Sequence, residues 1–224
     1  MGEEMRIAIL GAGRVGASLG AALKAKGHIV VFGAREPKVS AGFVTKTIDG
    51  AILSADAVIL ATPWTAAEAL VCEHAPALAG KIVIDATNPL NANATRLALG
   101  FDTSGAEVLQ SQARHATFFK AFNVVGPAAM ASPRYPQGIA AAFVAGPSGA
   151  QKDVVMGLVR DVGFDAVDVG ELRAARLLEP LSMLLMHLEK TGEKGRDLAL
   201  VLGSRTTRQA KPCPVVSMEA REAG

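Results

Sequence analysis

The chain has 224 residues, of which half are hydrophobic, 20% are charged and 4% are aromatic, and its formal net charge is +2. This composition excludes a disordered chain, and it gives no electrostatic reason to expect nucleic acid or a membrane surface as a partner. The length fits one domain, or one domain with a small addition. The apolar residues are mostly small or branched aliphatics, as in a buried parallel sheet covered by helices.

The two cysteines, Cys72 and Cys213, have no metal-ligand spacing with the four histidines, so we expect neither a metal site nor a disulfide framework. The acidic start of the chain lacks the features of a signal peptide, and no apolar run is long enough to cross a membrane. We therefore expect a cytoplasmic protein without a membrane partner.

Short apolar runs alternate with helical stretches along the chain. Strands are predicted at residues 6–10, 28–32, 55–61, 81–85, 117–122, 139–145 and 166–169. Helices are predicted at residues 14–26, at about 65–78 and from 147 to about 162, and the polar segment 87–105 is expected to be a loop. This alternation is typical of βαβ units, so we expect an α/β fold with a Rossmann-type, doubly wound, mostly parallel sheet.

A different pattern follows the last predicted strand. From Leu172 to Leu188 apolar residues keep a helical period, and further apolar residues spread around the helix. We expect this small C-terminal helical part to be buried on most sides, where it would cover the sheet, line a ligand cleft or pack against another subunit. The segment 205–224 is polar and is expected to be a mobile tail.

The clearest functional signal is the glycine-rich turn Gly11-Ala12-Gly13-Arg14-Val15-Gly16, between the first strand and the first helix. In a dinucleotide-binding turn, the glycines allow a tight turn, close approach of a pyrophosphate and close packing of the helix on the strand. The free N–H groups at the helix start also favour phosphate. We therefore expect these residues to bind a dinucleotide, the alternative being an ordinary glycine-rich turn.

The end of the second strand indicates which dinucleotide binds. An NAD site has an acidic residue there, whereas this strand is followed by Ala34 and Arg35. Arg35 would bind a 2′-phosphate, with Arg14 and Lys38 as additional cations, so NADP(H) is favoured. The alternative is a surface arginine paired with Glu36.

Three later loops should reach the same edge of the sheet, which holds the ligand in open α/β folds. They contain Ala61-Thr62-Pro63-Trp64, Asn88, and Asn123 with Gly126. We expect these residues to contact the ribose or the nicotinamide, although Pro and Asn are also ordinary turn residues. Trp64 is equally a candidate for the core, and it and Phe122 are the aromatic residues placed near predicted strand ends.

No catalytic residue is assigned. His115 and His187 have no partner nearby in the sequence, and a lone histidine is more often structural than catalytic. Hydride transfer between two stacked rings requires positioning rather than a protein acid or base.

Taken together, several motifs resemble the NADPH-dependent coenzyme F420 reductases and the reductase domain of the STEAP metalloreductases. They are the glycine-rich turn, Gly33-Ala34-Arg35, Thr62-Pro63-Trp64, residues 119–126 and residues 176–181, within a resemblance that covers residues 5–190. The resemblance implies hydride transfer between NADPH and coenzyme F420 or a related flavin, Arg35 as the 2′-phosphate ligand, and commonly a homodimer. Ala34 and Asn123 stand where the family tends to have serine and histidine.

The predicted organisation is an NADP-binding Rossmann domain at residues 1–170, a C-terminal helical part at 171–204 and a tail at 205–224. Two other functions stay open. One is NADPH-dependent reduction of a small carbonyl or imine, and the other is an NADP(H)-binding sensor without turnover.

Overall fold

A computed structural model describes residues 3–37, 43–192, 195 and 197–205 of the chain. The predicted cation Lys38 and residues 206–224 of the predicted tail lie outside this part. No helix within the described ranges is long and apolar enough to cross a membrane.

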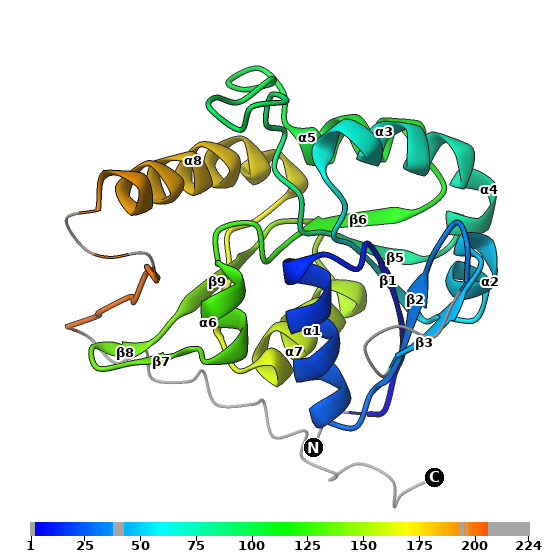
Figure 1. The fold of residues 1–224 in the computed structure, drawn as a ribbon, viewed down its shortest axis with the longest axis horizontal. Helices are drawn as coiled ribbons and strands as arrows, with labels where there is room; N and C mark the ends of the chain where they lie inside the picture. Colours follow the sequence, from blue (N-terminus) through cyan, green and yellow to red (C-terminus); the bar gives the residue numbers. More distant parts are fainter. Residues whose placement is uncertain (1–2, 38–42, 193–194, 196, 206–224) are drawn as a thin grey trace, which may run out of the picture.

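Six parallel strands form the central sheet, in the order β3-β2-β1-β4-β5-β6 (Figure 1). Their bounds are β1 Arg6–Leu10, β2 Ile29–Gly33, β3 Val44–Lys46, β4 Ala57–Leu60, β5 Ile82–Asp85 and β6 Thr117–Lys120. The chain leaves β1 toward one edge of the sheet and later returns toward the other edge through β4. Such a switch point opens a crevice at the carboxyl ends of the strands. The predicted Rossmann-type fold is confirmed.

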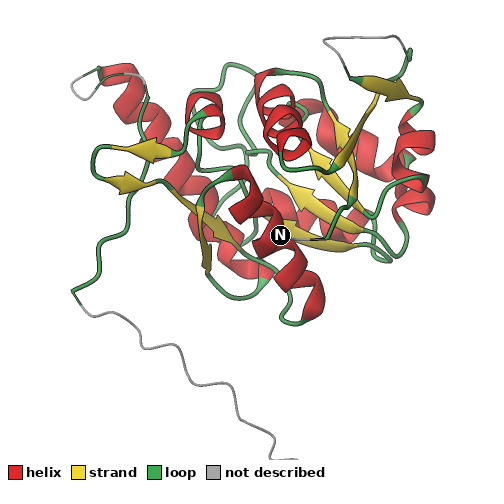
Figure 2. Ribbon diagram, turned by 90° about the horizontal axis from the view of Figure 1, so that it is seen from below, coloured by secondary structure: helices red, strands yellow, loops and turns green. Residues whose placement is uncertain are grey.

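Helices cover both faces of this sheet (Figures 1 and 2). One face carries α1 (Arg14–Ala25), α6 (Pro127–Ala131) and α7 (Ala150–Val162), and the other carries α2 (Ile48–Leu53), α3 (Trp64–Glu73), α4 (Ala75–Leu78) and α5 (Gly105–Gln112). In β1, Ile7 and Ile9 pack into one core cluster, whereas Ala8 and Leu10 pack into the other. A strand buried on both faces needs this continuous apolar sequence.

Two further strands extend the fold beyond β6. β9 (Ala141–Val144) and β10 (Asp165–Asp168) pair in parallel as a separate sheet. A single antiparallel bridge, Lys120 to Ala145, joins this sheet to β6. A short hairpin, β7 (Arg134–Tyr135) and β8 (Gly138–Ile139), was not predicted.

Two helical predictions were wrong in detail. The helix expected at 65–78 is divided into α3 and α4 at His74, because Pro76 has no N–H for the helical hydrogen bond four residues back. Helix α5 was missed at the end of the polar segment. Its start carries the capping-box pattern, in which the Ser104 hydroxyl accepts a hydrogen bond from the Glu107 backbone N–H (3.2 Å).

The C-terminal part consists of a 3₁₀ turn (Leu172–Ala174) followed by α8 (Ala175–Thr191). The expectation that this helix is buried on most sides is wrong: Leu177 is 73% exposed and Leu184 is 53% exposed. Its opposite face, which includes Leu178 and Leu185, is buried. Helix α8 is therefore one-sided, and its buried side faces the carboxyl edge of the sheet.

Candidate functional site

The glycine-rich turn has the geometry of an anion-binding loop. Gly11 has a φ of +115°, and a side chain there would collide with the Ala61 carbonyl. A side chain on Gly16 would collide with the Gly11 carbonyl, whereas one on Gly13 would meet nothing within 4 Å. No side chain caps the start of α1, and its first turn holds no acidic residue. The helix start therefore leaves N–H groups and space for a phosphate.

Three cavities lie along the carboxyl edge of the sheet, and Thr62 and Pro63 line all of them. The β2 cavity, about 660 Å³, is lined by Gly11, Ala12, Ala34, Arg35 and Thr47 among others. The α8 cavity, about 420 Å³, is lined by Gly13, Arg14, Asn123, Gly126 and Met186 among others. The β5-loop cavity, about 310 Å³, is lined by Val15, Ala61, Trp64, Thr87, Asn88 and Asn91 among others.

The β2 cavity holds the predicted 2′-phosphate residue. Arg35 is exposed, and it forms no hydrogen bond or ion pair with any described residue, so a pair with Glu36 is not found. Asp49 lines the same cavity, but its carboxylate is engaged by His74 (2.7 Å). Arg14 lines the α8 cavity instead, so the structure does not bring it together with Arg35. The two arginines thus face different parts of the cleft.

Hydrogen bonds of the Asn88 and Asn123 side chains connect two loops to each other and to α8. The Asn88 side-chain N–H₂ donates to the Asn123 carbonyl and to the Ser182 hydroxyl, both at 2.9 Å. The Asn123 side-chain N–H₂ donates to Asn88 Oδ1 (3.0 Å) and to the Leu178 carbonyl (3.1 Å). Because backbone carbonyls only accept, these partners fix the orientation of both amides. Both N–H₂ groups are spent within the protein, so these side chains position the loops.

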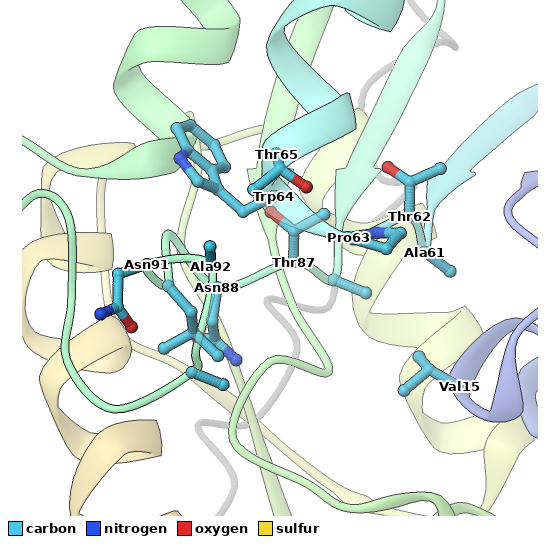
Figure 3. A pocket seen from close by; sticks show the side chains of 13 residues that line it. Val15, Ala61, Thr62, Pro63, Trp64, Thr65, Thr87, Asn88, Asn91 and Ala92 are labelled. Carbon is cyan, nitrogen blue, oxygen red and sulfur yellow. The ribbon is translucent and has the colours of Figure 1, made fainter.

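The two aromatic residues at the cleft, Trp64 in the β5-loop cavity and Phe122 in the α8 cavity, present little surface to it. Figure 3 shows the Trp64 indole pointing away from Val15 and Pro63, and Trp64 is 9% exposed within a core cluster. Phe122 is 2% exposed and packs against Phe164, with 6.3 Å between ring centroids. Both aromatic residues near strand ends are therefore core residues, and a ligand ring would lie against smaller side chains.

Three buried polar atoms lack a hydrogen-bond partner among the described residues: Thr62 Oγ1, Thr87 Oγ1 and Asn123 Oδ1. All three belong to residues that line the cavities. Buried polar groups in native proteins are nearly always paired, so unpaired ones collected in one cleft indicate a site that a polar ligand completes.

A buried ionic cluster, absent from the sequence prediction, lies beneath the cleft. The Lys120 ammonium contacts the carboxylates of Asp85 and Glu179, both at 2.8 Å, and donates to the Thr87 carbonyl (2.7 Å). These three side chains are at most 1% exposed. Burial lowers the pKa of Lys120, but attraction to the two carboxylates outweighs this and raises the pKa above its usual value. The cluster therefore holds a charged lysine at neutral pH.

Glu179 also joins two helices. Its carboxylate accepts hydrogen bonds from the backbone N–H groups of Gly105 (2.9 Å) and Ala106 (3.3 Å), at the start of α5. A negative charge is favoured at a helix N-terminus. A lysine that ends an apolar strand and an aspartate that ends its neighbour were the available sequence signals for this cluster.

The remaining candidates carry no visible chemistry. His115 and His187 are both exposed. Within the described ranges, no three His, Cys, Asp or Glu side chains are grouped so that they could hold a metal ion.

The glycine geometry gives a first prediction. Gly13→Ala should weaken NADPH binding about tenfold, or ~1.4 kcal/mol, because the new methyl group would occupy open space at the start of α1 that a dinucleotide-binding turn leaves for the pyrophosphate. Its free energy of unfolding should change by less than about 0.5 kcal/mol. Gly16→Ala is the contrasting variant, and it should lose roughly 1–3 kcal/mol of stability because its methyl group meets the Gly11 carbonyl. Calorimetric titration and urea unfolding measure the two quantities, and equal NADPH affinity in Gly13→Ala would contradict the prediction.

The sheet order, the glycine-rich turn and the cavities at the strand ends define a Rossmann-type fold of the dinucleotide-binding class. Residues 6–89 match the family model of NADP oxidoreductases, coenzyme F420-dependent. The resemblance predicted from the sequence motifs is confirmed by this match.

Two relatives extend the likeness beyond residue 89. The chain is 32% identical over 189 residues to the metalloreductase STEAP3 of Rattus norvegicus, which covers 82% of this chain and 38% of STEAP3. The chain thus spans well under half the length of that relative. A crystal structure assigned as an F420-dependent NADP reductase of Arthrobacter sp. FB24 superposes with a TM-score of 0.81 at 28% identity, over 89% of this chain and all of the other.

More distant structures share the fold alone. An imine reductase from Myxococcus stipitatus has a TM-score of 0.64 at 19% identity, over 84% of this chain and 62% of the other.

Proposed function

We propose that this protein is an NADP(H)-dependent oxidoreductase that transfers a hydride between NADPH and coenzyme F420 or a related flavin-type acceptor. The observation that carries the proposal is the cleft itself, where three buried polar atoms and Arg35, all without a partner among the described residues, lie along one edge of a Rossmann sheet. The family match over residues 6–89 supports the same cofactor.

The residues present fit an NADP(H) molecule laid along the three cavities. Arg35 would hold the 2′-phosphate in the β2 cavity, and the start of α1 after Gly13 would hold the pyrophosphate. Thr62, Asn88, Asn123 and Gly126 would surround the nicotinamide end. When bound, the cofactor supplies the hydride, and the protein contributes positioning and exclusion of water.

The charge of the cleft supports an uncharged ring as the acceptor. None of the described residues that line the β5-loop cavity is charged, and those of the α8 cavity include only Arg14 and Glu189. A small hydroxy acid or amino acid carries a carboxylate that requires a cation, and Arg14 stands at the phosphate end of the cleft. A flavin-type ring satisfies this environment without such a partner.

Location and assembly remain part of the proposal. The exposed leucines of α8, Leu177, Leu184 and Leu188, together with the family resemblance, support a homodimer. The cytoplasm stays the expected compartment.

The test is an anaerobic assay of the whole chain with NADPH and, separately, coenzyme F420, FMN, FAD and riboflavin, followed at the nicotinamide absorbance band. We expect NADPH oxidation with at least one of these acceptors and none with heat-denatured protein. Tight NADPH binding without oxidation by any flavin-type acceptor would reject the oxidoreductase and favour an NADP(H) sensor. Turnover restricted to an imine or carbonyl would reject the flavin-type acceptor.

A further inference from the structure

Hydrogen bonds and an ion pair connect the first half of α8 to the strand and loops that form the cleft. The Leu178 carbonyl accepts from Asn123, the Glu179 carboxylate contacts Lys120, and the Ser182 hydroxyl accepts from Asn88. These three α8 residues are at most 5% exposed. Ser182 lies four positions after Leu178 and three after Glu179, so it neighbours both on the same side of the helix.

The second half of α8 continues the same face into the α8 cavity. Leu185, Met186 and Glu189 line this cavity. Val125 and Leu198, which lie elsewhere in the chain, line it as well. Ser182 lies seven residues before Glu189, which is about 10 Å of helix at 1.5 Å per residue. A small tilt of the helix at its fastened half therefore moves the cavity wall.

Polar contacts between specific side chains hold α8 in place. The outward side of α8 is exposed at Leu177, Leu184 and Leu188, so apolar packing among the described residues holds only one side of the helix. The Lys120 ammonium that contacts Glu179 also binds the Thr87 carbonyl, in the loop that carries Asn88. The wall of the cavity and the loop at its floor are thus positioned by the same charged group.

We infer that α8 is the wall that selects the hydride acceptor, with Met186 as a specificity-determining residue and Glu179 and Ser182 as positioning residues. The acceptor class is a flat, uncharged ring that packs against Met186 and Leu185. The inference rests on the proposed function, because it concerns the acceptor side of the same cleft.

The test measures NADPH affinity and acceptor kinetics separately in the full chain, with coenzyme F420 and FMN as the acceptors because their rings differ. In Ser182→Ala we expect the acceptor KM to rise about threefold, and in Glu179→Gln about tenfold, with the NADPH Kd within twofold of the unmodified protein. Met186→Ala should change the ratio of kcat/KM between coenzyme F420 and FMN, whose rings differ, by about fivefold. Glu179→Gln leaves a buried N–H unpaired, and Ser182→Ala is the milder variant that keeps the test valid if the first does not fold.

Two variants on the same helix serve as controls. Arg176→Gln breaks the ion pair with Glu107 (2.7 Å), which also joins α8 to α5 but is only partly buried, with side chains 22% and 25% exposed. Met183→Ala removes a methionine that lines none of the three cavities. We expect both controls to keep the acceptor KM and the ratio of kcat/KM between coenzyme F420 and FMN within twofold.

The outcomes separate the two proposals. If the unmodified protein oxidises NADPH with none of coenzyme F420, FMN, FAD and riboflavin, the proposed function is overturned and this inference with it. If the unmodified protein turns over but Ser182→Ala and Met186→Ala behave as their controls do, the inference alone is overturned. A melting temperature that falls without any change in KM has the same meaning, since a merely structural role lowers stability and leaves the KM of the folded protein unchanged.

Discussion

Arg35→Ala is expected to weaken NADPH binding by roughly 1.5–3 kcal/mol, or about 10- to 150-fold, and to leave NADH binding nearly unchanged. Arg35 lines the largest of the three cavities and has no partner among the described residues, so its guanidinium is available for a 2′-phosphate. NADH lacks that phosphate and loses nothing. Titration calorimetry or fluorescence with both nucleotides measures the difference.

Arg14→Ala is the matched control. Arg14 is also exposed but lines the α8 cavity, beside the start of α1, so its removal should weaken NADPH and NADH to the same extent. If Arg35→Ala also weakened both nucleotides equally, the 2′-phosphate role would be wrong.

Lys120→Met should cost about 3–5 kcal/mol of folding free energy, the largest stability effect that we expect in this protein. The substitution leaves the buried carboxylates of Asp85 and Glu179 without their shared cation. Urea unfolding monitored by circular dichroism measures the loss. Adding Glu179→Met in the same chain should restore part of it, because one of the uncompensated charges is then removed.

Lys152→Met provides a comparison for the same substitution. The Lys152 ammonium contacts Asp168 (2.8 Å), whose side chain is 49% exposed and regains water when the lysine is removed. We expect a loss of about 1–2 kcal/mol there. Equal losses in the two variants would show that burial of the Lys120 cluster has no special weight.

The pH dependence of the Lys120 contribution follows from its raised pKa. A group whose folded pKa lies above its unfolded value of 10.5 stabilises the protein fully below pH 10.5, and this contribution disappears as the pH rises through the folded pKa. The stability difference between the unmodified protein and Lys120→Met should therefore be constant from pH 7 to about 10 and shrink above that.

The sequence predicted the sheet well because its strands are short apolar runs separated by recognisable helices. Around the glycine-rich turn, the predicted ends of β1, α1 and β2 lie within one residue of the observed ends. Short elements were harder, since α2 has six residues and β3 has three, too few to show a period. Helix α5 was visible only through its capping box at Ser104 and Glu107, which the polar segment before it obscured.

The position of the candidate site could be predicted from the sequence, but the hydrogen bonds of its side chains could not. Thr62, Asn88, Asn123 and Gly126 all reach one cavity, as the ends of parallel strands require. Their hydrogen bonds depend on partners far away in sequence, such as Ser182 for Asn88, and no local pattern reveals these. The Lys120 cluster was not predicted, because its partners are also far away in the sequence. A lysine at the end of an apolar strand does not by itself indicate that it is buried or which carboxylates it contacts.

The carboxylate of Glu179 has a consequence for how this chain reaches its native state. It closes contacts with residues up to 74 positions earlier, at the start of α5, and completes the charge balance of a lysine and an aspartate that are themselves 35 positions apart. Until the ribosome has released residue 179, β5 and β6 can pair, but the first turn of α5 has no carboxylate at its N–H groups. The charge balance of the buried Lys120 cluster is therefore completed only after this part of α8 has been synthesised.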